Sequence, residues 1–377
     1  MTKDNLRMKY QILLIIILSI IFGFAAGLLG ELWINDFLRT GKTETQKIQT
    51  LTERLDQLTE RQDKKLKDIL AEKDLSVSQT IDNVRPAIVS FYTDRKQTNT
   101  WNDILMPQNF VGVGTIITAD GWILTDRSVV SDQTSKLAVT FENEVYDVES
   151  YVCDTATNAC FAKIEAADLP VIDLTSREFL TNGQTALVIS LNEIYPTTIE
   201  SLYYSPIKVR SDYVHSSEEF YKTIKLNDQL DEKWLGAPVV NLNGQVFGFL
   251  STDNVVFPID NIQNIMRQAI AGEQIARSVL GLHYIDLTEA VGWEEFTEQK
   301  QGALIFGIEG KPAILVNSPA QKAGLLANDI IISVDDDPVN ENNSLSSLIQ
   351  SYKAADEIKL KVLRGEEEIE VDVTLTQ

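Results

Sequence analysis

Histidine and cysteine, whose side chains often serve as catalytic bases, nucleophiles and metal ligands, are scarce in this chain of 377 residues. It has two histidines, His215 and His283, and two cysteines, Cys153 and Cys160. We expect His215, in a polar stretch, to be an exposed loop residue, because a catalytic histidine needs an orienting partner and a nucleophile within reach. The cysteines could pair across neighbouring strands in an oxidising compartment, or remain as two buried thiols. Two cysteines without a nearby histidine do not fill a tetrahedral metal shell, so we expect neither a metal site nor a cofactor.

Short β-like segments dominate the region from about residue 78 to residue 258, and they must position any chemistry found there. The runs typical of strands are 87–92, 114–117, 138–141, 186–189 and a hairpin at 239–249 that turns at Asn243-Gly244. Many short strands separated by Gly, Asn, Asp and Pro indicate an antiparallel barrel architecture. A helical pattern at 259–276 then leads to a last region of strands with one short helix.

Two stretches carry a resemblance to a known family. The run 112–130 predicts a strand, a tight turn and a second strand, and it resembles the first-barrel signature of trypsin-like HtrA serine proteases. The run 318–335 resembles the PDZ domains appended to those proteases, and 362–366 continues that match as a closing hairpin. The resemblance covers nearly everything after residue 78. It implies a mainly β fold, with a two-barrel trypsin-like protease domain followed by an α+β PDZ domain.

The same resemblance places the catalytic triad on residues that cannot form one. The family's mechanism uses a serine to attack, a histidine to take its proton and an aspartate to hold the imidazole. Here Ser128 stands at the histidine position, Asn158 at the aspartate position and Leu235 at the nucleophile position. Lys233 replaces the glycine of the oxyanion hole, which suggests a loop of another shape. The resemblance therefore implies that every catalytic element is missing.

This conclusion does not depend on the register of the match. Neither histidine lies in the predicted first barrel, and no serine lies between Ser217 and Ser251. A replacement mechanism would need a serine beside a desolvated lysine, for which Ser128 with Lys163 or Lys233 is the available pairing. We expect no such dyad, because the scaffold is built for a nucleophile at a different position.

The peptide groove of the PDZ domain is the site that the resemblance leaves intact. Such domains add an extended peptide to a sheet edge and hold its terminal carboxylate with backbone N–H groups. The predicted peptide-binding residues are Leu280, Gly281, Leu282, His283, Leu345 and Leu348. The N–H groups of Gly281, Leu282 and His283 would converge on the carboxylate, and the leucines would line an apolar pocket and its facing helical wall. The alternative interpretation is that these side chains only complete the domain core. His283 beside the carboxylate would make peptide binding depend on pH.

Composition and the N-terminus limit the cellular context. A net charge of −22 argues against a nucleic-acid partner, because phosphate binding needs clustered basic residues. The apolar run 12–29 matches the thickness of a bilayer core, and Lys3, Arg7 and Lys9 precede it. The positive-inside rule then leaves the N-terminus in the cytoplasm and the bulk of a single-pass protein outside the cell membrane. A cleaved signal peptide is the competing interpretation, although the run exceeds the about 7–15 residues of a signal core.

Residues 43–75 predict a helical stalk. Ile48, Leu51, Leu55 and Leu58 keep a heptad spacing, but two clean heptads fall short of the about three to four that define a coiled coil. Either the stalk self-associates or it is a solvated spacer. The expected segments are a tail 1–9, a transmembrane anchor 10–30, a helical or coiled-coil stalk 31–77, a double barrel 78–260, a linker helix 261–278 and a PDZ domain 279–377.

These expectations favour a membrane-anchored, exported HtrA-like pseudoprotease. It would bind peptides or C-terminal tails of exported proteins through its PDZ domain and serve as a scaffold, sensor or adaptor. The family usually assembles as trimers, so the resemblance also implies a homotrimer. Two alternatives stay open: a serine endopeptidase with atypical catalytic residues, and a regulatory subunit of an active homologue.

Overall fold

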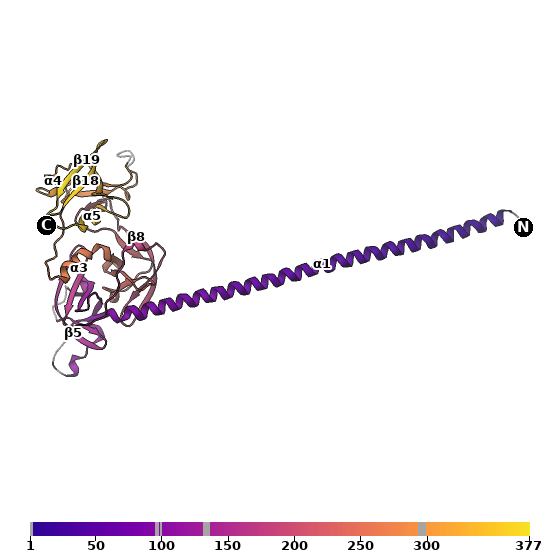
Figure 1. Cartoon of the computed structure of the whole chain (residues 1–377), viewed down its shortest axis with the longest axis horizontal. Helices are drawn as coiled ribbons and strands as arrows, with labels where there is room; N and C mark the ends of the chain where they lie inside the picture. The colour runs from indigo at the N-terminus through magenta and orange to yellow at the C-terminus, as the bar shows by residue number, and fades with distance from the viewer. Residues whose placement is uncertain (1–2, 95–97, 99, 131–135, 293–298) are drawn as a thin grey trace. The chain divides into compact units, whose positions relative to one another are not determined.

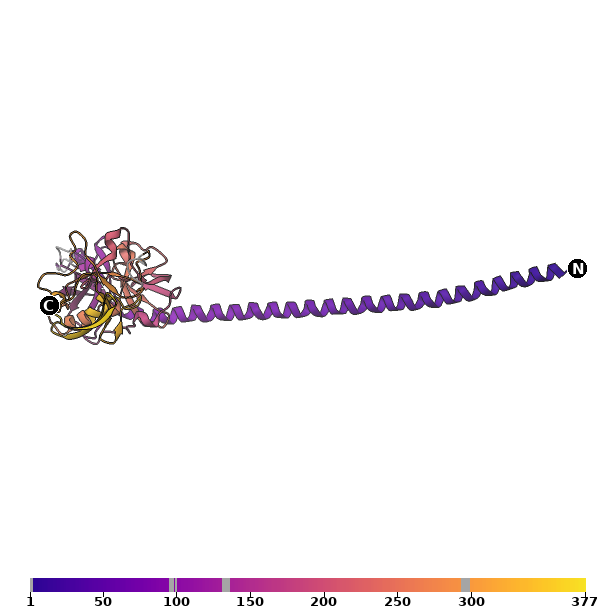
Figure 2. The same ribbon diagram turned by 90° about the horizontal axis from the view of Figure 1, so that it is seen from above.

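The computed structural model describes residues 3–94, 98, 100–130, 136–292 and 299–377, and it divides the chain into two compact units, 1–75 and 76–377. The first unit is helical. Helix α1 (Lys3–Val84) begins there and is drawn as one continuous helix in both views (Figures 1 and 2). Within its stretch Met8–Asn35, an 18-residue window has a mean hydropathy of 3.0, and none of the residues in that window is buried. This stretch is long and apolar enough to cross a membrane.

The last turns of α1 belong to the second unit and pack against its core. Val84 is buried, and Val77 and Ile81 contact the same hydrophobic cluster. The Thr80 hydroxyl donates a hydrogen bond to the Leu242 carbonyl oxygen at 2.6 Å. These contacts hold the last turns of α1 against the hairpin of residues 239–249 and the hydrophobic core.

Six strands close into the first barrel. They are β1 (Ile88–Tyr92), β2 (Phe110–Ile116), β3 (Trp122–Asp126), β4 (Ala138–Phe141), β5 (Glu144–Cys153) and β6 (Ala159–Ile164), paired in the order β1-β2-β3-β6-β5-β4. Phe91, Ile123 and Phe161 are fully buried among them. The structure joins Cys153 and Cys160 in a disulfide at a register pair of β5 and β6, which selects one of the two states that the sequence left open.

Six further strands close into the second barrel. They are β7 (Thr185–Ile189), β8 (Ile194–Tyr204), β10 (Thr223–Leu226), β11 (Pro238–Val240), β12 (Val246–Leu250) and β13 (Val255–Pro258), paired in the order β10-β13-β12-β11-β7-β8. The predicted hairpin is present as β11 and β12, with Gly244 at a φ of 81° in the turn. Helix α3 (Gln263–Ile270) follows and is shorter than the predicted linker helix 261–278. It ends there because Gly272 adopts a φ of 71°, which terminates an α-helix.

A third sheet contains the C-terminal strands. They are β14 (His283–Asp286), β15 (Ala303–Ile305), β16 (Ile330–Val334), β17 (Asp337–Pro338), β18 (Glu357–Arg364) and β19 (Glu367–Thr374), with the short helices α4 (Pro319–Lys322) and α5 (Leu345–Ser351). Figure 1 shows β18, β19, α4 and α5 grouped in the yellow, C-terminal part of the chain. Tyr284 is fully buried in this region. The mainly β fold class predicted from the sequence, two barrels followed by a PDZ domain, is confirmed.

One of the two edge strands of the third sheet, β9, comes from an earlier part of the chain. The sheet order is β19-β18-β16-β15-β14-β9, and β9 (Val214–Ser216) belongs to the connection between β8 and β10 of the second barrel. His215 is therefore not the exposed loop residue that the sequence predicted. It is 8% exposed in β9, and its ring stacks on that of Tyr221 with the centroids 3.5 Å apart. Strand pairing and aromatic packing bury it.

Candidate functional site

A hydroxyl–carboxylate cluster lies where the two barrels meet. Strand β3 ends at Asp126, and the short helix α2 (Arg127–Val130) begins directly after it. Ser128 donates two hydrogen bonds to Asp126 Oδ1, from its backbone N–H at 2.8 Å and from its hydroxyl at 2.5 Å. The Ser251 hydroxyl, just after β12 of the second barrel, donates to Asp126 Oδ2. A carboxylate thus holds the hydroxyl at the expected histidine position.

Burial governs the ionisation of this cluster. Asp126 is 1% exposed, and desolvation raises its pKa, although the hydrogen bonds from Ser128 and Ser251 partly lower it.

Asn158 also belongs to this cluster, since its side-chain amide donates to the Ser251 hydroxyl at 3.5 Å. The backbone carbonyl oxygen of Asn158 accepts a hydrogen bond from the Arg127 backbone N–H at 2.7 Å. The structure therefore brings Ser128 and Asn158 together through Asp126 and Ser251.

The loop at the expected nucleophile position contains a compact helical turn. Glu232–Trp234 form a 3-10 helix, and the Leu235 N–H donates to the Glu232 carbonyl oxygen at 3.0 Å. The Leu235 carbonyl oxygen accepts the Val113 N–H at 2.8 Å. A backbone N–H can stabilise an oxyanion only if it points at the reacting atom. The Leu235 N–H points instead at the Glu232 carbonyl oxygen.

Gly236 fixes this loop against the first barrel. Its φ is 78°, and a Cβ at this position would overlap the Val113 carbonyl oxygen and the Thr125 hydroxyl. Glycine is therefore the residue that permits both the left-handed conformation and the close approach. Leu235 is held at the barrel surface as a result.

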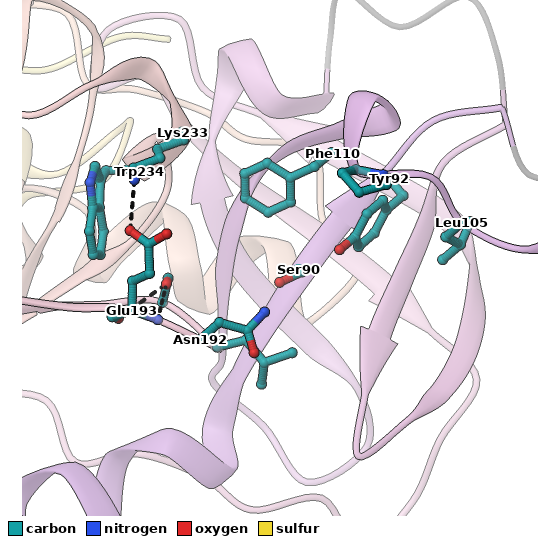
Figure 3. Close-up of a pocket in the computed structure, with 11 residues that line it drawn as sticks. Ser90, Tyr92, Leu105, Phe110, Asn192, Glu193, Lys233 and Trp234 are labelled. Atoms are coloured by element: carbon teal, nitrogen blue, oxygen red, sulfur yellow. Dashed lines mark hydrogen bonds and ion pairs between the residues drawn. The ribbon is translucent and has the colours of Figure 1, made fainter.

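Lys233 points to the rim of a pocket of about 350 Å³ between the barrels (Figure 3). The residues that line the pocket are Ser90, Tyr92, Leu105, Pro107, Phe110, Ser190, Leu191, Asn192, Glu193, Lys233 and Trp234. Lys233 Nζ lies 2.7 Å from Glu193 Oε2, and this hydrogen bond raises the pKa of Lys233. The ammonium group therefore keeps its proton and does not act as a base near neutral pH.

The other groups that could replace the triad base lie in other contacts. Lys163 Nζ contacts the Asp120 carbonyl oxygen and lies 3.4 Å from Asp120 Oδ2. The two histidines of the chain lie in β9 and β14, in the third sheet. Among the described residues, Lys163, Lys233 and the two histidines thus make no hydrogen bond or ion pair with the Ser128 cluster.

The predicted peptide-binding residues lie at the start of β14 and in α5. Leu280, Leu282 and Leu345 are fully buried, Leu348 is nearly so, and all four belong to the core of the PDZ domain. Gly281 has a φ of 81°, and a Cβ there would overlap the Ser318 side chain. The His283 ring Nδ1 lies 2.6 Å from the Pro312 carbonyl oxygen.

Backbone N–H groups at this turn meet a carboxylate from within the chain. Leu280 and Gly281 donate to Glu218 Oε1 at 3.0 and 2.8 Å, and Leu282 donates to the Ser217 hydroxyl at 3.1 Å. The His283 N–H donates instead to the Ala313 carbonyl oxygen. Two of the three N–H groups expected to face a carboxylate, those of Gly281 and Leu282, thus meet acceptors of residues 217 and 218.

Sequence reasoning missed Asp126, Ser251 and Glu218. Asp126 stands two residues before Ser128, a spacing at which a carboxylate often accepts from a nearby backbone N–H, so a local signal existed. Ser251 and Glu218 carried none, because their partners are distant in the chain.

Two family models match the chain. The trypsin-like peptidase domain model matches residues 112–249, and the PDZ domain model matches residues 295–375. Both matches agree with the barrels and the third sheet described above.

Curated relatives match about 70% of this chain. A "Probable periplasmic serine endoprotease DegP-like" of Pseudomonas fluorescens is 26% identical over 275 residues, which cover 70% of this chain and 56% of the relative. A "Putative serine protease HhoB" of Synechocystis sp. is 24% identical over 269 residues, covering 68% of this chain and 64% of the relative. The chain spans little more than half the length of such relatives.

Solved structures of an HtrA-type protease share the fold. "HtrA-type protease AlgW with tripeptide" superposes with a TM-score of 0.59 at 16% identity, covering 80% of this chain and 96% of that one. "HtrA-type protease AlgW with decapeptide" superposes with a TM-score of 0.57, also at 16% identity, covering 80% and 98%. Together with the family models, these likenesses support a trypsin-like two-barrel fold followed by a PDZ domain for this chain.

Proposed function

We propose that this protein is an HtrA-like pseudoprotease that binds peptides through its PDZ domain without cutting them. Peptide hydrolysis needs a nucleophile, a base that takes its proton and donors aimed at the oxyanion. The observation that carries the proposal is the Ser128 cluster. Its hydroxyl donates to a buried carboxylate, and Asn158 stands at the aspartate position. A carboxylate is a much weaker base than an imidazole, so it leaves the serine hydroxyl protonated.

The second candidate is a serine endopeptidase with atypical catalytic residues. The relatives' names favour it, since they are called serine endoproteases. A Ser128–Asp126 pair would be its chemical basis. Against it stands the Leu235 loop, whose N–H is bonded to Glu232 and is not directed at a substrate carbonyl.

The cellular setting forms part of the same proposal. The Met8–Asn35 stretch serves as a single-pass anchor with Lys3, Arg7 and Lys9 in the cytoplasm. The word "periplasmic" in the names of relatives supports an extracytoplasmic body. The proposal includes the domain limits stated above and assembly as a homotrimer. Leu51, Leu55 and Leu58 on α1 are exposed and available for self-association. Light scattering on the detergent-purified full chain measures the oligomeric state.

The PDZ domain supplies the proposed binding activity. HtrA-type structures "with tripeptide" and "with decapeptide" share this fold, which supports an extended peptide as the ligand class. The test mixes the full chain in detergent with fluorescein-labelled decapeptides that end in Val, Leu or Phe with a free carboxylate. We expect saturable binding and full recovery of the intact peptide by mass spectrometry. Binding accompanied by progressive cleavage would favour the endopeptidase, and equal binding of the amidated twins would contradict carboxylate recognition.

A further inference from the structure

A segment of the second barrel's own connection occupies the outer edge of β14. Ser216, His215 and Val214 pair antiparallel with His283, Tyr284 and Ile285 in that order. The segment therefore runs toward the 280–282 turn. This is the direction in which a bound C-terminal peptide would run on this edge, because its carboxylate must reach that turn.

A side-chain carboxylate completes the likeness to a peptide terminus. Glu218 Oε1 accepts hydrogen bonds from the Leu280 and Gly281 N–H groups at 3.0 and 2.8 Å. Ser217, which is fully buried, donates its N–H to the Leu282 carbonyl oxygen at 3.0 Å and accepts the Leu282 N–H on its hydroxyl. Backbone N–H groups that bind an anionic acceptor form charge-assisted hydrogen bonds, which are stronger than neutral ones.

The residues after Glu218 hold this segment on the PDZ domain. Tyr221 stacks on His215 and donates its hydroxyl to Asp286 Oδ2 at 2.6 Å. Lys222 Nζ lies 2.8 Å from the same carboxylate oxygen, and both charged side chains are buried. Tyr221 and Lys222 therefore hold the connection against Asp286, the last residue of β14.

We propose that residues 214–218 are an intramolecular ligand of the PDZ groove, with the Glu218 carboxylate in the place of a peptide's C-terminal carboxylate. The inference rests on the peptide-binding function proposed above. An external peptide binds only after this segment leaves, so its measured affinity is reduced by the fraction of molecules in which the groove is open. Because the segment connects β8 to β10, its release also frees the connection on the second barrel.

The first test compares Glu218→Ala with Glu219→Ala in the full chain in detergent. Glu219 is the exposed neighbour and carries the same charge, so it is the matched control. The probes are the same free-carboxylate decapeptides. We expect the dissociation constant of Glu218→Ala to fall about tenfold or more, and that of Glu219→Ala to stay within about twofold of the wild type. Equal affinities in the two variants would overturn the proposal. If Glu218→Ala unfolds, Glu218→Gln replaces it, because it removes the charge and keeps the shape.

The second test follows hydrogen exchange in the wild type. Saturating peptide should speed exchange of the 214–217 amides while the β14 amides stay protected, because the peptide takes over the pairing. Peptide binding with 214–217 still protected would contradict displacement. If no peptide binds any variant, yet Glu218→Ala alone speeds exchange across 214–217, Glu218 holds the segment and the peptide-binding function fails instead.

Discussion

At the scale of single residues, the Ser128 cluster is defined by the carboxylate that accepts its hydrogen bonds. Ser128 and Ser251 both donate to Asp126, whose carboxylate is buried at the junction of the barrels. Hydroxyl donors around one carboxylate form a satisfied structural cluster, because every partner in it has a hydrogen bond. The same arrangement leaves Ser128 without a base strong enough to activate it.

Replacing Asp126 with Asn should change how stability depends on pH. Burial raises the pKa of Asp126, so the folded state binds this proton more tightly than the unfolded state does. Stability from the neutral acid is present below the unfolded pKa of about 3.9 and is lost as pH rises through the folded pKa. The free energy of unfolding of the wild type, relative to Asp126→Asn, should therefore fall as pH rises above about 4 and through the raised pKa of Asp126. Urea unfolding at each pH measures it, and a constant difference would contradict the assignment.

The sequence named positions in this site but not the contacts between them. Ser128, Asn158, Leu235 and Lys233 were assigned by matching a linear motif, and the loss of catalysis at these positions stays a prediction. The Asp126–Ser251 hydrogen bond joins residues 125 positions apart, and no local pattern encodes such a contact.

At the scale of elements, one glycine sets the geometry of the Leu235 loop. Gly236→Ala should lower the free energy of unfolding by about 3 kcal/mol, from the left-handed backbone and from the overlap with Val113 and Thr125. Gly183→Ala is the control, because Gly183 has a similar φ of 82° with nothing within 4 Å of its added Cβ. Gly183→Ala should lower the free energy of unfolding by only about 1 kcal/mol. If urea unfolding shows a similar drop in the free energy of unfolding for both variants, the close contact of Gly236 with Val113 and Thr125 does not fix the loop.

Periodicity and turn residues predicted most barrel strands and the helix α5. They missed β9, because three residues in a polar stretch become a strand only when β14 pairs with them. They overextended α3, because Gly272 ends it earlier than the apolar pattern does.

At the scale of the whole second unit, Arg277 links the first barrel to the PDZ domain. Its guanidinium donates to both Asp154 oxygens at 2.7 and 2.5 Å and to the Gln350 side chain of α5 at 3.0 Å. Burial would raise the pKa of Asp154, but the hydrogen bonds and charge of Arg277 outweigh it and hold that pKa below its ordinary value.

Arg277→Met should therefore destabilise this unit in a pH-dependent way. Leaving the buried Asp154 carboxylate without its partner should cost about 3 kcal/mol at pH 7. A depressed pKa contributes stability above the unfolded value of about 3.9, and this contribution is lost as pH falls through the folded pKa. The difference between Arg277→Met and wild type should shrink below about pH 4, as followed by urea unfolding. A difference that persists at low pH would assign the effect to packing alone.

The most direct measurement of the central claim is the reaction of the full chain with a fluorophosphonate, followed by peptide mass spectrometry and a casein digestion in parallel. An active trypsin-type protease serves as the positive control. The account predicts no phosphonyl adduct on Ser128 or Ser251 and no casein fragments. An adduct on either serine, together with casein cleavage that disappears in Ser128→Ala, would contradict it.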